Sequence, residues 1–131
     1  MQVKLLFVYG TLRKGGENHY FIQSVPCWAE RAWLQGTLAD TGNGYPALVL
    51  SEGGRVAGEL YLVDWDGIGK SLDRLEDYWG PGDARNEYER VEVQVETDRG
   101  PVQAWTYVYS EEQAASLRVI SSGDWMVRGD G

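Results

Sequence analysis

Residues 3–16 read VKLLFVYGTLRKGG, and this stretch predicts both the start of a sheet and a candidate binding loop. Residues 3–9 are almost all apolar, which is typical of a strand buried on both faces. The strand runs directly into a loop, residues 10–16, that holds three glycines, a threonine and two cations. Such a loop can be a plain turn, a phosphate-binding loop, or a set of backbone amides around another anion. The rest of the chain has to decide between these three.

Composition and charge narrow the class of protein. The chain has 131 residues and is 43% hydrophobic, so we expect one domain covering residues 1–131. Twelve basic against 20 acidic residues give a net charge of −8. This argues against nucleic-acid or anionic-membrane partners, because both require positive potential. The single cysteine excludes an internal disulfide, and we find neither a secretory leader nor a membrane-spanning run. We therefore expect a cytoplasmic protein of open oligomeric state.

Helical and strand patterns alternate without repeats or low-complexity segments. Apolar residues spaced three and four apart predict an amphipathic helix over residues 65–78, which ends before the Gly-Pro-Gly of residues 80–82. Shorter helices are predicted at residues 17–24 and 111–119. Strands are predicted at residues 28–38, 47–50, 55–63, 88–97 and 102–109, the last two as a hairpin. Together these elements indicate an α+β domain whose sheet is mixed and strongly curled or closed.

Few residues are available for metal binding or for nucleophilic catalysis. His19 and Cys27 are the only histidine and cysteine, which argues against a His/Cys metal site. A Ser-His-Asp or Cys-His site would have to use His19, and no nucleophile elbow is present. Gly16 and Glu17 stand where a phosphate-binding loop carries lysine and a hydroxyl residue. An all-carboxylate metal site stays possible but has no spacing signature, and we predict neither metal nor cofactor.

Glu76 is the carboxylate of the predicted helix that we single out. With about 100° of rotation per residue, it lies about 60° from the centre of the apolar stripe near Leu72 and Trp79. Asp73 and Asp77 point further outward. Two interpretations remain open at this point. Glu76 is either a glutamate at the edge of the core or a general base whose pKa is raised by desolvation.

Five motifs, in this order, resemble the γ-glutamylcyclotransferase-like family. They are VYGTLRKGGENH at 8–19, GYPALV at 44–49, VAGELYLV at 56–63, SLDRLEDY at 71–78 and YERVEVQV at 88–95. The resemblance runs from residue 3 to about residue 109, and the late Gly-Asp-Trp of residues 123–125 also fits. It implies a small mixed β-barrel with short flanking helices. It also implies release of 5-oxoproline from small-molecule γ-glutamyl amides or amines, without metal or cofactor.

The resemblance also implies which residues form the site. The catalytic glutamate of the family falls on Glu76, and a tyrosine at the start of the following strand falls on Tyr88. Asp77 stands where the family often has glycine. Arg13 and Lys14 are interpreted as solvated surface cations. The loop after the first strand would line the site and hold the substrate α-carboxylate through backbone amides, which places Tyr9, Gly10, Thr11 and Leu12 there.

In the implied reaction the nucleophile belongs to the substrate. Its own α-amine attacks its own γ-carbonyl, so the protein supplies a near-attack geometry and a base. Two alternatives stay open: a non-catalytic binding module for a glutamyl-like molecule, and an amidase in which Glu76 activates water. The sequence does not name the leaving amine, which we expect the loops at residues 41–45 and 80–87 to select.

Overall fold

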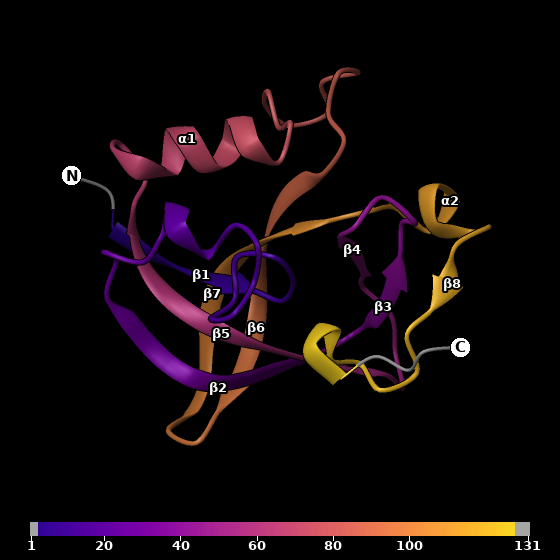
Figure 1. Cartoon of the computed structure of the whole chain (residues 1–131), viewed down its shortest axis with the longest axis horizontal. Helices are drawn as coiled ribbons and strands as arrows, with labels where there is room; N and C mark the ends of the chain where they lie inside the picture. The colour runs from indigo at the N-terminus through magenta and orange to yellow at the C-terminus, as the bar shows by residue number, and fades with distance from the viewer. Residues whose placement is uncertain (1–2, 128–131) are drawn as a thin grey trace.

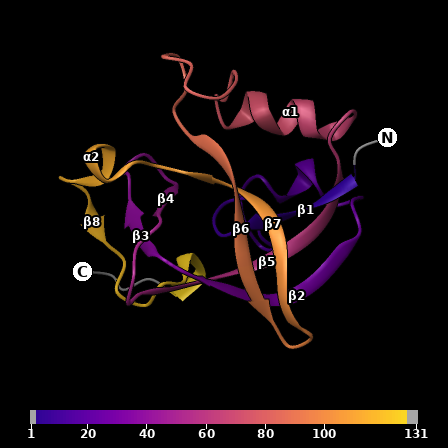
Figure 2. The ribbon, with the colours of Figure 1, turned by 180° about the vertical axis from the view of Figure 1, so that it is seen from behind.

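Five strands close into a barrel in the computed structural model, which describes residues 3–127 (Figure 1). In spatial order they are β1 (Val3–Val8), β5 (Arg55–Asp64), β2 (Cys27–Gln35), β6 (Glu89–Thr97) and β7 (Gly100–Val108). Neighbours are antiparallel except β1 and β7, which run parallel and meet at Leu6 and Trp105. The predicted closed, mixed sheet is confirmed, and so is the hairpin of β6 and β7, seen from behind in Figure 2.

A second sheet of three strands lies beside the barrel. Its order is β4 (Pro46–Val49), β3 (Thr37–Asp40) and β8 (Arg118–Val119). The single strand predicted for residues 28–38 is therefore wrong, because the chain passes from one sheet to the other at Gly36. A β-carbon there would lie 2.9 Å from the side chain of Leu48 and 3.0 Å from the carbonyl oxygen of Val49. Glycine permits this close passage between the sheets.

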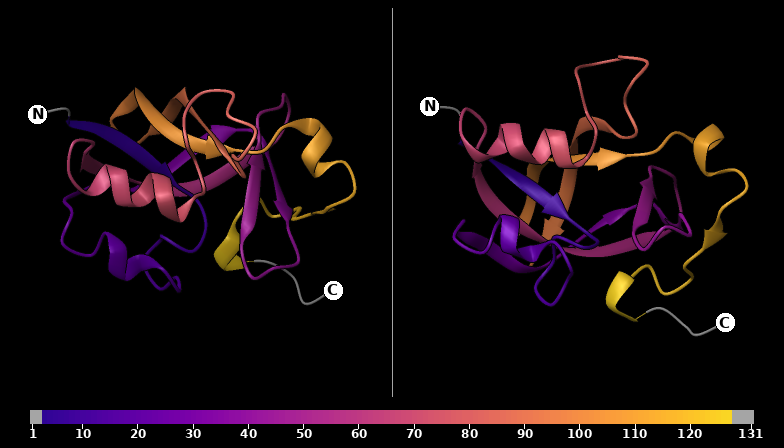
Figure 3. Two further views of the ribbon diagram at one scale, coloured as in Figure 1. Left: turned by 90° about the horizontal axis from the view of Figure 1, so that it is seen from above. Right: turned by 45° about the horizontal axis from the view of Figure 1, so that its top comes forward.

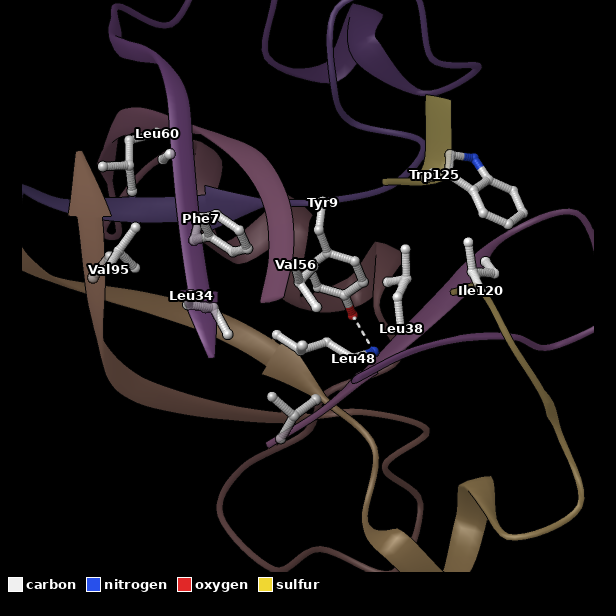
Figure 4. Packing of buried hydrophobic residues seen from close by; sticks show 13 residues of the cluster. Phe7, Tyr9, Leu34, Leu38, Leu48, Val56, Leu60, Val95, Ile120 and Trp125 are labelled. Carbon is white, nitrogen blue, oxygen red and sulfur yellow. Dashed lines mark hydrogen bonds between the residues drawn. The ribbon is translucent and has the colours of Figure 1, made fainter. Parts of the chain in front are cut away.

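One apolar cluster fills the barrel and continues under the second sheet. Phe7, Val56 and Leu60 come from the barrel strands, whereas Leu38 and Leu48 come from the second sheet (Figure 4). All five are almost fully buried. Each such side chain contributes about 1.5–3 kcal/mol by leaving water, so the cluster holds the two sheets together.

The main helix, α1 (Ile68–Leu75), is shorter than predicted. It ends because Asp77 adopts a left-handed backbone with φ of 54°, a conformation that glycine adopts most easily. Trp79 therefore leaves the apolar stripe and is 38% exposed, with its ring against the guanidinium groups of Arg74 and Arg85. Placing Trp79 at the centre of the stripe was wrong for this reason.

The two shorter predicted helices are also corrected. Residues 17–24 form only a 3₁₀ turn, η1 (His19–Phe21). Within residues 111–119, α2 (Glu111–Ala114) is followed by β8, and a further 3₁₀ turn, η2 (Trp125–Val127), ends the described chain. No helix within residues 3–127 combines the length and the hydrophobicity needed to cross a membrane.

Arg13 ties the loop after β1 to two distant parts of the chain. Its guanidinium donates to Glu59 on β5 at 3.1 Å and to Asp124 at 2.6 Å. The side chains of Arg13 and Glu59 are only 12% and 7% exposed. The expected solvated position of Arg13 is therefore wrong. Lys14 does lie at the surface, where it pairs with Glu30.

The two cations of this loop should differ in their contribution to stability. We expect Arg13→Met to lower the free energy of unfolding by about 3 kcal/mol, because Glu59 would remain buried without its cation. Lys14→Met is the matched control and should change it by less than about 1 kcal/mol. Urea unfolding at pH 7 measures both, and equal losses would contradict the structural role of Arg13.

Candidate active site

A cavity of about 190 Å³ opens where β1, the end of α1 and the second sheet meet. Its volume lies below the roughly 300–1,000 Å³ of drug-sized pockets, so it suits a small group. All six residues that the sequence placed in the site line it, although their roles remain predictions. The lining is made of residues 7–12 with Asn18, Tyr45, Pro46, Leu75, Glu76, Glu87, Tyr88 and Tyr107.

Three consecutive residues of the loop after β1, Gly10, Thr11 and Leu12, line this cavity. Among the described residues, none accepts a hydrogen bond from the amides of Gly10, Thr11 or Leu12. The loop is braced from its other side, because Asn18 donates to both the carbonyl and the hydroxyl oxygen of Thr11. His19 Nδ1 donates to the carbonyl of Leu12 at 2.8 Å, which gives this histidine a structural partner. Free amides in a row favour an anion as the ligand.

Gly10 is required for a steric reason. A β-carbon at this position would lie 2.7 Å from two ring carbons of Pro46. Gly10 is not among the residues with positive φ, so left-handed backbone geometry does not explain it. The close contact lets the loop lie against the start of β4, which closes one side of the cavity.

Glu76 follows the last residue of α1, and its amide still donates to the carbonyl of Leu72. The side chain is partly buried in the cavity wall. Among residues 3–127, none donates a hydrogen bond to its carboxylate. Burial, together with the negative charge of Glu87, raises the pKa of Glu76 from an ordinary 4.5 to about 8. A carboxyl group of this kind can accept and return a proton near neutral pH.

The two predicted site tyrosines both donate to the main chain. The Tyr9 hydroxyl donates to the carbonyl of Tyr107 at 2.7 Å and accepts from the amide of Leu48 at 3.3 Å (Figure 4). The Tyr88 hydroxyl donates to the carbonyl of Pro46 at 2.7 Å. Burial raises the pKa of both hydroxyls. Tyr9 therefore belongs to the core and to the cavity wall at once.

Tyr107 extends from the cavity to a partly buried ion pair. Its hydroxyl donates to Asp73 at 2.7 Å, and Arg90 donates to both oxygens of the same carboxylate at 2.8 and 2.6 Å. The Arg90 guanidinium also lies against the rings of Trp105 and Trp65. Asp73, which was expected to point further outward than Glu76, is 20% exposed and bonds to residues of two barrel strands.

Glu87 is the second carboxylate of the cavity wall. The hydroxyls of Tyr45 and Tyr109 both donate to its Oε2 at 2.6 Å. Tyr45 and Glu87 come from the two loops expected to form the pocket for the leaving amine, and Figure 3 shows the second loop rising from the end of α1. The structure brings these loops together, whereas their role in selection remains a prediction. Within residues 3–127, no cluster of three or more His, Cys, Asp or Glu residues could hold a metal ion.

Comparisons with known proteins agree with this geometry. The family described as "Gamma-glutamyl cyclotransferase, AIG2-like" matches residues 6–127. The Gamma-L-glutamyl-butirosin B gamma-glutamyl cyclotransferase of Niallia circulans is 45% identical over 120 residues, which cover 92% of this chain and 74% of that protein. A putative gamma-glutamylcyclotransferase of Vibrio cholerae is 40% identical, with coverage of 95% and 96%.

The chain belongs to the AIG2-like gamma-glutamyl cyclotransferase family. Solved structures of YkqA from Bacillus subtilis and of a mouse AIG2-like protein share its fold, with TM-scores of 0.74 and 0.64 and identities of 34% and 27%. The alignment with YkqA covers 95% of this chain but 40% of that longer chain, and the alignment with the mouse protein covers 83% and 78%. The resemblance seen in the sequence is confirmed, and the protein is an enzyme of the cyclotransferase type.

The sequence did not predict two side-chain pairs of this site, Tyr107 with Asp73 and Tyr45 with Glu87. Tyr107 and Asp73 lie 34 positions apart, and Glu87 and Tyr45 lie 42 apart. No local pattern links such pairs. The one available signal was the tyrosine content of GYPALV and of the segment after β7, because a buried tyrosine needs a partner for its hydroxyl.

The raised pKa of Glu76 predicts a pH-dependent stability. The carboxyl group of Glu76 binds its proton more tightly in the folded protein than in the unfolded chain. The stability gained from this proton is fully present below pH 4.5 and is lost as the pH rises through about 8. The loss is at most about 1.4 kcal/mol per pH unit. We expect Glu76→Gln to become increasingly more stable than the wild type between pH 5 and 9, as measured by urea unfolding. Glu112→Gln, at an exposed position, is the control. Parallel curves for the wild type and Glu76→Gln would contradict the assignment.

Proposed function

We propose that this cyclotransferase releases 5-oxoproline and a free amine from a small γ-glutamyl substrate, with Glu76 as the general base. The observation that carries this proposal is the position of Glu76, a carboxyl of raised pKa, in one small cavity with three unpaired backbone amides. The amides suit the α-carboxylate of a glutamyl group, and Glu76 suits its α-ammonium.

Substrate binding would fold the glutamyl chain on itself. With the α-carboxylate at the amides of residues 10–12, the α-nitrogen faces Glu76 and the γ-carbonyl carbon is held close to that nitrogen. Fixing such a near-attack geometry lowers the barrier without any nucleophile from the protein. This accounts for a cavity that holds neither a serine nor a cysteine nucleophile.

Proton transfer to Glu76 starts the reaction. An α-amino group has an ordinary pKa of about 8, whereas an unperturbed glutamate lies near 4.3. The pKa of about 8 at Glu76 removes most of this mismatch. The free α-amine then attacks the γ-carbonyl carbon, and a new C–N bond closes the five-membered ring.

The oxyanion and the leaving nitrogen then need stabilisation. The hydroxyl proton of Tyr88 is already donated to Pro46, so Tyr88 would have to release that bond before serving an oxyanion. Backbone amides that have no partner are better prepared for this role. Protonated Glu76 gives its proton to the leaving nitrogen as the original amide bond breaks. The Glu76 carboxylate then takes the second proton from the new ring nitrogen and passes it to the released amine, which departs as an ammonium ion. No water enters the products, and Glu76 ends the cycle in its starting state.

Loss of the base should abolish most of the activity. Glu76→Gln keeps the volume of the side chain but cannot take the proton, so we expect kcat to fall by at least about 100-fold. The assay is release of 5-oxoproline from a panel of γ-glutamyl amines and dipeptides. Glu112→Gln removes the same charge outside the cavity and should retain full activity. Near-normal turnover by folded Glu76→Gln would place the base elsewhere, and no product from any substrate would favour a binding module.

The fate of solvent oxygen separates cyclotransfer from hydrolysis. In ¹⁸O-labelled water we expect unlabelled 5-oxoproline and free amine in equal amounts, because the attacking atom is the substrate nitrogen. N-acetylation of the α-amine should abolish turnover, since an amide nitrogen is a very weak nucleophile. Mass spectrometry of the initial products distinguishes the outcomes. Glutamate labelled in its γ-carboxylate would instead identify an amidase in which Glu76 activates water.

A further inference from the structure

The cavity wall carries negative charge without a compensating cation. Its lining includes two carboxylates, Glu76 and Glu87, and no lysine, arginine or histidine. The nearest loop cations are used elsewhere, because Arg13 pairs with Glu59 and Asp124 while Lys14 pairs with Glu30. A ligand that enters this cavity therefore meets only negative groups and neutral donors.

Glu87 is held in place without being neutralised. Tyr45 and Tyr109 fix its Oε2 with two short hydrogen bonds of 2.6 Å. Among residues 3–127, none forms an ion pair with Glu87 or donates a hydrogen bond to its Oε1. The side chain is partly buried and comes from the loop that faces the end of α1. A carboxylate fixed in this way loses little conformational entropy when it binds a cation.

The arrangement is electrostatically unfavourable in the absence of a ligand. The charge of Glu87 acts on Glu76 across the cavity and disfavours ionisation of the base. A positive group near Glu87 would relieve this repulsion. The α-ammonium of a glutamyl group is needed at Glu76, so the charge opposite Glu87 has to come from the other half of the substrate.

We propose that Glu87 determines specificity by binding a further ammonium group on the leaving amine. The inference rests on the proposed cyclotransfer, because it concerns the group that this reaction releases. The preferred substrates are then γ-glutamyl conjugates of amines that carry a second positive charge. Conjugates of amino acids place a carboxylate in the same region, where the cavity lining offers no cation and the charge of Glu87 repels it.

Three conjugates of equal length test the charge preference. They are γ-glutamyl-1,4-diaminobutane, γ-glutamyl-n-pentylamine and γ-glutamyl-5-aminopentanoate, which end in an ammonium, a methyl and a carboxylate. We expect kcat/KM for 5-oxoproline release to fall in that order, with at least about tenfold between the first two. Raising the salt concentration should reduce the difference, because the site is only partly buried.

The variant Glu87→Gln assigns the preference to one residue. Glutamine can still accept the tyrosine hydroxyl bonds but carries no charge, so kcat/KM for the diamine conjugate should approach that for the neutral one. Any effect of Glu87 on the base alters all three substrates alike and cancels in their ratio. Glu112→Gln removes the same charge outside the cavity and should leave the ratio unchanged.

The outcomes separate this inference from the proposed function. No 5-oxoproline from any conjugate with the wild type would overturn both. Turnover of all three at similar rates, or preference for the carboxylate, would overturn the inference alone. An unchanged ratio in folded Glu87→Gln would also overturn it, because Glu87 would then act on the shared glutamyl half. If that variant does not fold, the wild-type ranking alone decides.

Discussion

The hydroxyl of Tyr9 is the contact on which the site depends. It donates to the carbonyl of Tyr107 and accepts from the amide of Leu48, so one side chain at the end of β1 joins the barrel to the second sheet. The residues that follow must then pass against Pro46, where only glycine fits at position 10. The three free amides lie where they do because the chain is held immediately before them. A rearrangement of the two sheets would therefore also move the loop of residues 10–12.

The repulsion between the two carboxyl groups of the cavity lowers the stability of the folded protein. Glu76 and Glu87 line one cavity without a cation, and burial together with the charge of Glu87 raises the pKa of Glu76. Elsewhere Arg13 neutralises the buried carboxylate of Glu59, and Arg90 neutralises the partly buried carboxylate of Asp73. This contrast separates the structural ion pairs from the reactive cavity. Perturbed groups of this kind gather at functional sites, where the energetic penalty tunes a group for proton transfer.

The sequence predicted the features that depend on local periodicity and on ordered motifs. The first strand, the hairpin of β6 and β7, the main helix and the curled mixed sheet all follow from such patterns. Most of the errors have another origin. The early end of α1 is a local effect, because it follows from the left-handed backbone of Asp77. The break at Gly36, in contrast, depends on the distant Leu48 and Val49. The buried state of Arg13 depends on Glu59 and Asp124, which lie 46 and 111 positions away. Single-sequence patterns contain no information on such contacts.

The candidate site shows the same difference between what local sequence patterns predict and what long-range contacts determine. The motifs pointed to all six residues that the cavity brings together, yet no local pattern indicated that Glu87 pairs with Tyr45 and Tyr109 or that Tyr107 pairs with Asp73. In the proposed reaction these contacts set the charge around the substrate, whereas the predicted residues supply the backbone amides and the base. An intramolecular reaction requires little chemistry from the protein, because the substrate brings its own nucleophile. Loop residues outside the motifs can then vary the charge that meets the leaving group while the loop amides and Glu76 stay in place, so one cavity can serve different amines.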